Sequence, residues 1–139
     1  MLTNINHITF AVNDVDVSFD FYTNILGFTP RAKWNSGAYL SLGHLWLCLS
    51  VDRVDTKQDY THYAFNIEER EMAAFKEKLK AFEVSEWKTN KSEGESVYFL
   101  DPDGHKLEAH CGNLESRLNS CKDKPYAGMN FFLNVYPRC

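Results

Sequence analysis

Two histidines and one carboxylate are the residues whose types and spacing best fit a metal centre. His7 and His62 lie in matching contexts, NHITFAV and THYAFNI, and Glu108 lies in the apolar segment KLEAH. A carboxylate inside an apolar strand costs free energy unless its charge is compensated, and neutral imidazoles are good metal donors. We therefore expect these three side chains to hold one divalent cation. Three protein ligands leave coordination positions open, as in a catalytic site, and the set suits Mn²⁺, Fe²⁺ or Zn²⁺.

Three further histidines compete for this role. His44 and His105 fall in predicted hairpin turns, where we expect them to be solvated. His110 follows Glu108 by two residues, so a regular strand places both side chains on one face. We interpret His110 as a core or supporting residue, and a metal-bound structure with His110 as a ligand would overturn that choice.

The two halves of the chain predict the same order of elements. Aligning His7 with His62 places a short strand at the start of each half, and a helix follows because apolar residues recur every three or four positions. Gly27 is a typical residue to end the first helix. The apolar helix positions are Val15, Phe19, Tyr22 and Leu26 in the first half, and Met72, Phe75, Leu79 and Phe82 in the second.

Three strands are predicted after each helix. Turn residues separate the last two strands of each half, at Gly43-His44 and at Asp101–Gly104, where Pro fixes one dihedral and Gly accepts positive φ. The predicted strands are residues 28–34, 37–43 and 45–51, then 84–90, 96–101 and 106–111.

The sequence thus predicts an α+β fold of two βαβββ modules that form a curved, partly open barrel. The first module is expected over residues 1–55, and the second, with a C-terminal extension, over residues 56–139. The alternative is that two α+β halves match by chance. Agreement among the helices, hairpins and leading histidines favours a duplication.

Composition argues against several functional classes. The 139 residues carry a net charge of −4 and no basic run, so nucleic-acid binding is not expected. The N-terminus does not resemble a secretory signal, and no apolar run approaches transmembrane length. The four cysteines form no CxxC pair, which favours a cytoplasmic protein with reduced thiols over one with a disulfide.

The segment WKTNKSEGESVY, followed later by Arg117, gathers positive charge and hydroxyl groups. By itself this segment would fit an ordinary solvated hairpin. If it converged on the metal, the same side chains would bind a phosphate-like group.

The motifs NHITFAV, GAYLSLGHLWLCLS, DYTHYAF, WKTNKSEGES, YFLDPDGHKLEAH and PYAGM resemble the manganese-dependent fosfomycin-resistance glutathione transferases of the vicinal oxygen chelate superfamily. The resemblance runs from Met1 to about Met129 and is weaker in the tail and in the loop that joins the halves. It implies that the glutathione thiol is added to the epoxide ring of fosfomycin. It also implies a module-swapped homodimer, in which His7 of one chain meets His62 and Glu108 of the other.

The same resemblance implies roles for individual residues. Mn²⁺ would be held by His7, His62 and Glu108, and the hydroxyl of Thr9 would lie near the epoxide oxygen. K⁺ would bind a loop that favours the glutathione-using branch over the bacillithiol-using one. The remaining residues implied are Lys88, Ser92, Tyr98 and Arg117 for the phosphonate, Trp46 and Tyr60 for the pocket walls, Asn90, Ser92, Gly94 and Ser96 for K⁺, and Trp34 and Tyr39 for the thiol channel.

Other functions on this fold remain as alternatives. One is another enzyme of the superfamily, such as a glyoxalase-like isomerase or a ring-cleaving dioxygenase. A second is a non-enzymatic drug-sequestering protein of the bleomycin-binding type, and a third is an inactive paralogue. Cys48 is expected to be a small buried hydrophobe, because the nucleophile would be the glutathione sulfur.

Overall fold

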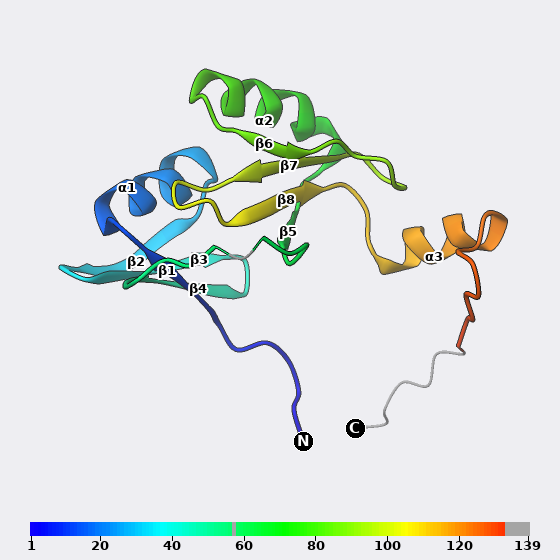
Figure 1. The fold of residues 1–139 in the computed structure, drawn as a ribbon, viewed down its shortest axis with the longest axis horizontal. Helices are drawn as coiled ribbons and strands as arrows, with labels where there is room; N and C mark the ends of the chain where they lie inside the picture. The colour runs from blue at the N-terminus through cyan, green and yellow to red at the C-terminus, as the bar shows by residue number, and fades with distance from the viewer. Residues whose placement is uncertain (57, 133–139) are drawn as a thin grey trace.

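The computed structural model describes residues 1–56 and 58–132 and has an α+β fold built from two four-stranded sheets (Figure 1). The first sheet has the strand order β1-β4-β3-β2. Its β1 runs parallel to β4, and the other neighbours are antiparallel. The strands are β1 (Ile8–Val12), β2 (Thr29–Trp34), β3 (Gly37–Leu42) and β4 (Leu45–Val51).

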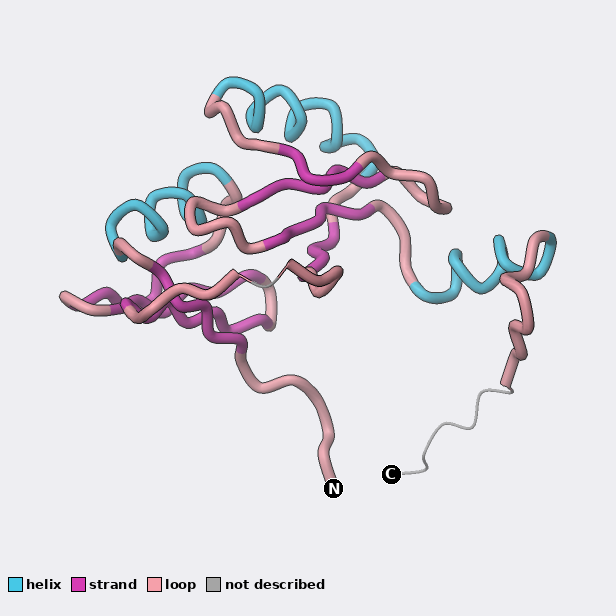
Figure 2. The backbone as a smooth tube through the Cα atoms, viewed as in Figure 1, coloured by secondary structure: helices cyan, strands magenta, loops and turns pink. Residues whose placement is uncertain are grey.

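The second sheet repeats this topology, with the order β5-β8-β7-β6 and β5 parallel to β8. Its strands are β5 (Tyr63–Asn66), β6 (Glu86–Lys88), β7 (Ser96–Leu100) and β8 (Lys106–His110). The two sheets lie in separate open layers (Figure 2). The predicted α+β fold with two βαβββ units is therefore confirmed. The proposed module boundary, between residues 55 and 56, falls in the connection from β4 to β5.

Each module carries one helix between its first two strands. Helix α1 (Val15–Asp20) begins where the Asp14 side chain accepts hydrogen bonds from two backbone N–H groups, and it continues into a π-helical turn, η1 (Phe21–Ile25). Gly27 ends this segment with φ +84°, as expected for a glycine C-cap. Helix α2 (Glu69–Ala81) buries Met72 and Leu79.

Phe82 departs from the predicted apolar face of α2. The helix ends at Ala81, and Phe82 is 54% exposed at the C-cap. The spacing identified the buried face correctly up to Leu79. It failed at the last position because the backbone leaves the helix there.

The turn between β7 and β8 joins the second module to the first. The Tyr22 hydroxyl donates to Asp101 Oδ2 at 2.7 Å, and both atoms lie in the interior. Asp103 Oδ1 accepts from the backbone N of Asn13 at 3.0 Å and from its side-chain amide at 2.8 Å. Around this turn the two modules share one core, in which Phe10 packs on Tyr63 with ring centroids 5.0 Å apart.

A third helix, α3 (Leu114–Asp123), was not predicted. Asn113 and Ser116 form a capping box at its start, and that pair was the sequence signal for it. The helix projects away from both sheets (Figure 1). Among the described residues, none of the helices combines the length and apolarity needed to cross a bilayer.

Candidate metal centre

His62 and Glu108 come together at the start of β5 and in the middle of β8. His62 lies one residue before β5, and the register of the two parallel strands places Glu108 beside Ala64. His62 Nε2 lies 3.1 Å from Glu108 Oε1. The Glu108 carboxylate is buried, whereas the His62 imidazole is only partly buried.

The hydrogen bonds of His62 define which ring nitrogen can bind a metal. Its Nδ1 lies 2.8 Å from the Tyr60 carbonyl oxygen, so Nδ1 must carry a proton and donate it. In the neutral ring, Nε2 then presents a lone pair to Glu108. Fixing the tautomer through the other nitrogen is the usual arrangement around a metal-binding histidine.

The pair fits one cation shared between its two atoms. An imidazole lone pair facing a carboxylate oxygen is stable only when a proton or a cation lies between them. A neutral imidazole nitrogen and a carboxylate oxygen are both donors that such a cation accepts. These two atoms lie 3.1 Å apart, so His62 and Glu108 would be able to hold such a cation together.

His7 lies elsewhere in the same chain. It directly precedes β1, so its place in the first module matches that of His62 in the second. Its Nδ1 is 2.7 Å from Asn6 Oδ1, and its exposed ring packs on Trp46 with centroids 4.5 Å apart. One chain therefore brings together two members of the predicted triad and leaves the third on the other module.

A cationic and aromatic wall, formed by Lys88, Tyr60 and Tyr98, lies next to His62. Lys88 Nζ donates to the Tyr60 hydroxyl and lies over the Tyr60 and Tyr98 rings, 4.5 and 5.0 Å from their centroids. The hydrogen bond to Tyr60 raises the pKa of Lys88 above its ordinary value. Lys88 is thus a charged donor beside the His62–Glu108 pair. Trp87, which the sequence did not single out, also contacts the His62 ring.

The loop from Asn90 to Ser96 is closed by its own side chains. The Asn90 amide nitrogen donates to the Gly94 carbonyl at 2.8 Å and to the Ser92 carbonyl at 3.4 Å. These two carbonyl oxygens therefore converge on one point. The Asn90 oxygen accepts from the backbone N of Ser92 at 3.2 Å.

Two helices anchor this loop through its carboxylates. Arg117 on α3 binds Glu93 through Nε at 3.2 Å, and its Nη2 lies 3.4 Å from the Ser92 hydroxyl. Lys76 on α2 binds Glu95 at 2.8 Å. The sequence does not predict the ion pairs of Glu93 and Glu95, because nothing in the pattern of charges indicates which pairs meet in space.

The first module presents aromatic residues and a hydroxyl group. Trp34, Tyr39 and Trp46 form a continuous contact series, with ring centroids 4.7 and 5.4 Å apart, and all three are exposed. Thr9 is exposed on β1 and lines a cavity of about 240 Å³ that also contacts Tyr63.

Comparison with known proteins identifies the family. Residues 4–109 match the Glyoxalase/Bleomycin resistance protein/Dioxygenase superfamily. The chain is 51% identical to Glutathione transferase FosA of Serratia marcescens, over 94% of this chain and 96% of that one. It is 40% identical to Metallothiol transferase FosB of Lysinibacillus sphaericus, over 93% and 96% of the two chains. The chain belongs to this superfamily, in its group of fosfomycin-resistance proteins.

A solved member of the group has the same fold. The fosfomycin resistance protein FosX of Listeria monocytogenes, in its complex with Mn(II) and sulfate, superposes with a TM-score of 0.77 at 31% identity, over 86% of this chain and 98% of that one. The curated relatives are named as transferases. They favour an enzyme over the drug-sequestering alternative.

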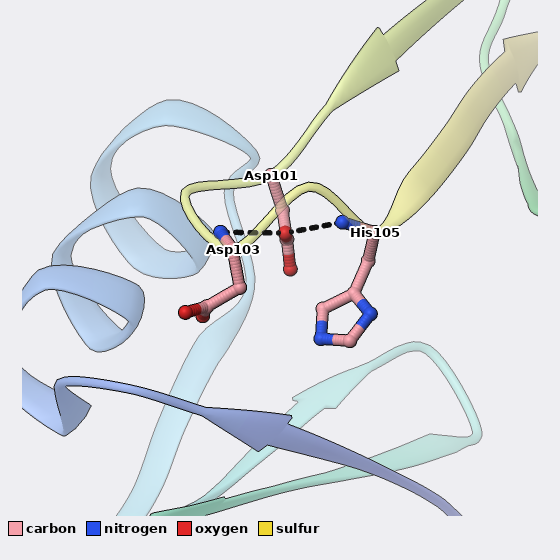
Figure 3. A group of neighbouring side chains, drawn as sticks. All are labelled: Asp101, Asp103 and His105. Atoms are coloured by element: carbon pink, nitrogen blue, oxygen red, sulfur yellow. Dashed lines mark hydrogen bonds between the residues drawn. The ribbon is translucent and has the colours of Figure 1, made fainter. Parts of the chain in front are cut away.

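A second group of potential ligands lies in the turn between the last two strands. Asp101, Asp103 and His105 bring one ligand atom each within 4.8 Å of one another (Figure 3). Asp101 Oδ1 accepts from the backbone N of Asp103 and of His105, and His105 Nε2 donates to the Ala11 carbonyl at 2.8 Å. Because these polar atoms bind the protein itself, we interpret the group as a structural turn.

His105 is therefore not the solvated residue that the sequence predicted. Its ring is half-buried and stacks on Phe10, with centroids 4.9 Å apart. The turn is folded back against β1, which the local sequence alone does not reveal. His44 is exposed, as expected. Cys48, Cys111 and Cys121 are free thiols, and Cys139 lies outside the described residues.

Proposed function

We propose that this chain is a metal-dependent transferase that adds the glutathione thiol to the epoxide ring of fosfomycin. The His62–Glu108 contact, whose geometry fits one divalent cation, carries the proposal. The 51% identity with Glutathione transferase FosA supports the choice of thiol and substrate. The dihydroxypropylphosphonic acid bound to a FosX variant of Listeria supports a small phosphonate as the ligand class.

The metal would be held by His62 and Glu108 of one chain together with a second imidazole, that of His7. Mn²⁺ is supported by the Mn(II) complex of FosX. Bound there, the cation would act as a Lewis acid that stabilises negative charge on the epoxide oxygen as the ring opens. Glu108 would keep its charge because the cation compensates its burial.

His7 requires a second chain in this proposal. Within one chain its ring contacts Trp46, on the module opposite to His62. In a module-swapped homodimer, His7 of the partner subunit would complete the triad, and Thr9 would accompany it on the same strand. Two equivalent sites would follow from the twofold symmetry of such a dimer.

Lys88, Tyr98, Ser92 and Arg117 would bind the phosphonate. Lys88 is charged and contacts the Tyr60 ring, which itself packs on His62, and Arg117 already lies 3.4 Å from the Ser92 hydroxyl. Charge-assisted hydrogen bonds of this kind orient a tetrahedral anion. Trp46 and Tyr60 would line the same pocket. With the phosphonate fixed, the epoxide carbon is presented to the thiol in one orientation.

The loop from Asn90 to Ser96 would hold K⁺ next to this anion. The Ser92 and Gly94 carbonyl oxygens converge on the Asn90 amide, and a rotated Asn90 would add its own oxygen. Ser96 would supply a hydroxyl. Glutathione would approach along the exposed aromatic series of Trp34 and Tyr39, whose flat faces suit a flexible peptide.

A reconstitution assay tests the proposed reaction. Purified protein is incubated with fosfomycin, glutathione, Mn²⁺ and K⁺, and the products are identified by mass. We expect a one-to-one adduct that requires Mn²⁺ and glutathione and increases with K⁺. A diol product without the thiol would indicate addition of water instead, and unchanged fosfomycin under all conditions would contradict the proposal.

A further inference from the structure

Four side chains form a compact group on one face of the β7–β8 hairpin. The antiparallel register pairs Ser96 with His110 and Tyr98 with Glu108. Because alternate residues of a strand point to the same face, these two pairs lie side by side. Ser96 and Glu108 are both buried. His110 therefore lies directly next to the proposed metal ligand, with its Nδ1 3.5 Å from Glu108 Oε2.

The hydrogen bonds within this group have one consistent direction. Ser96 Oγ donates to Glu108 Oε2 at 2.6 Å, which uses the single proton of the hydroxyl. The same oxygen lies 2.6 Å from His110 Nδ1, so it accepts from that nitrogen. Donation thus runs from His110 to Ser96 and on to Glu108. The oxygen of Glu108 that it reaches is not the one facing His62.

Two glycines, Gly94 in the loop and Gly112 after β8, bring the backbone close to the His110 ring. Gly94 has φ +79°, and a Cβ there would lie 2.7 Å from His110 Cε1. Gly112 has φ +135°, and a Cβ there would lie 3.0 Å from His110 Nε2. The loop from Asn90 to Ser96 therefore packs closely on the imidazole, and a change in the conformation of the loop would change this contact. His110 connects the conformation of this loop to the Glu108 carboxylate.

The first module has the same positions without this group. Its register pairs Gly37 with Ser50 and Tyr39 with Cys48, which are the counterparts of the Ser96–His110 and Tyr98–Glu108 pairs. The first module has Cys48 in place of Glu108, and it also lacks the imidazole and the bridging hydroxyl, because Ser50 replaces His110 and Gly37 replaces Ser96. The coincidence indicates that His110 serves the carboxylate and is not a general requirement of the hairpin.

We propose that His110 is a positioning residue. Through Ser96 it fixes the rotamer of Glu108 and transmits the ordering of the loop from Asn90 to Ser96 to the metal site. The inference rests on the proposed function in taking Glu108 as a metal ligand and the loop from Asn90 to Ser96 as the K⁺ site. It does not depend on the identity of the substrate.

Mn²⁺ affinity, measured by electron paramagnetic resonance of the free ion, tests the role of His110. His110→Asn keeps an N–H donor near the position of Nδ1, whereas His110→Gln places its amide nearer to Nε2. Loss of a partner that orients a metal ligand weakens metal binding about 10- to 100-fold. We expect that loss for His110→Gln and Ser96→Ala, and an affinity close to that of the wild type for His110→Asn. Thermal unfolding of the metal-free proteins controls for folding.

The same titration tests the connection to the loop. In the wild type, we expect K⁺ to strengthen Mn²⁺ binding relative to tetramethylammonium at equal ionic strength, and His110→Gln to abolish that difference. Folded His110→Gln and Ser96→Ala proteins that bind Mn²⁺ like the wild type would overturn the inference, as would equal losses in His110→Gln and His110→Asn. A wild type that binds Mn²⁺ in this way but forms no adduct would contradict the proposed function alone. A wild type that takes up no Mn²⁺ would overturn both.

Discussion

The two modules of this chain have one topology but different chemistry. In each module, a histidine directly precedes the first strand, and that strand runs parallel to the module's last strand in chain order. At matching registers, the second module has Glu108 and the first has Cys48. The second module also places Lys88 over the rings of Tyr60 and Tyr98. The first module exposes the rings of Trp34, Tyr39 and Trp46.

In the proposed site, a duplicated fold would divide one metal centre between its halves. The backbone supplies equivalent positions twice, so each module needs to contribute only part of the machinery. The second module has the carboxylate, its hydrogen-bonding support and the cationic wall. The first offers an imidazole and an aromatic surface. With one carboxylate instead of two, the proposed centre would keep coordination positions open for a substrate.

The largest effect is expected from removing the carboxylate that distinguishes the modules. Glu108→Gln keeps the shape but loses the charge that a cation needs, so Mn²⁺ binding and adduct formation should both be abolished. Metal content by mass spectrometry and product by liquid chromatography measure the two. Glu115→Gln, at the exposed start of α3, is the control and should match the wild type. Retention of both properties in Glu108→Gln would remove the metal site from the account.

The cationic wall is the next most sensitive feature. Lys88→Ala removes a charged donor next to His62, and hydrogen bonds to charged groups contribute about 1.5–3 kcal/mol, or roughly 10- to 150-fold in kcat/KM for fosfomycin. Lys91→Ala removes an exposed lysine from the loop that follows β6 and should change kcat/KM little. Equal losses in the two variants would mean that net charge, and not the position of Lys88, governs anion binding.

The contact between the modules can be broken at Tyr22. Tyr22→Phe leaves the buried Asp101 carboxylate without its hydroxyl donor, which should lower the free energy of unfolding by about 1–3 kcal/mol. Urea denaturation followed by circular dichroism measures the change. An unchanged midpoint would show that this buried hydrogen bond contributes nothing to joining the two halves.

The buried carboxyl group of Asp101 is expected to make the free energy of unfolding depend on pH. Burial raises the pKa of its carboxyl above the ordinary 3.8, against the opposite effect of the Tyr22 hydroxyl. The folded state therefore holds this proton more tightly, and the unfolding free energy falls as pH rises from 3.8 through the raised pKa. The stability difference between the wild type and Asp101→Asn should decrease over that interval. Asp123→Asn, on the surface, should show no such trend.

The smallest effect is expected at the counterpart of Glu108 in the first module. Cys48 is buried on β4, and Cys48→Ala should retain most adduct formation because the nucleophile is the thiol of glutathione. A large loss of activity, with folding and Mn²⁺ binding intact, would give the first module a chemical role that its sequence does not suggest.

The repeated pattern made most of the fold predictable. Apolar spacing located α2, and the Asp-Pro-Asp-Gly turn located the end of β7. Helix α3 was missed because its start depends on the capping box of Asn113, in a segment with a weak apolar pattern.

The candidate site was predictable in residue type more than in geometry. The sequence identified His62 and Glu108, which the structure brings together. It did not reveal the burial of His105 against Phe10 or the pairing of Glu93 with Arg117. Such contacts depend on how distant segments pack, and one sequence carries no local signal for them.

The division of the site between two chains is tested most directly by mixing two inactive variants. His7→Ala and His62→Ala should each fail to form adduct. Mixed dimers of the two would contain one intact site, built from the remaining wild-type histidines, so co-refolding equal amounts should restore about a quarter of wild-type activity. If the mixture stays inactive although the mixed dimer has formed, His7 and His62 do not act across the subunits, and the account is wrong.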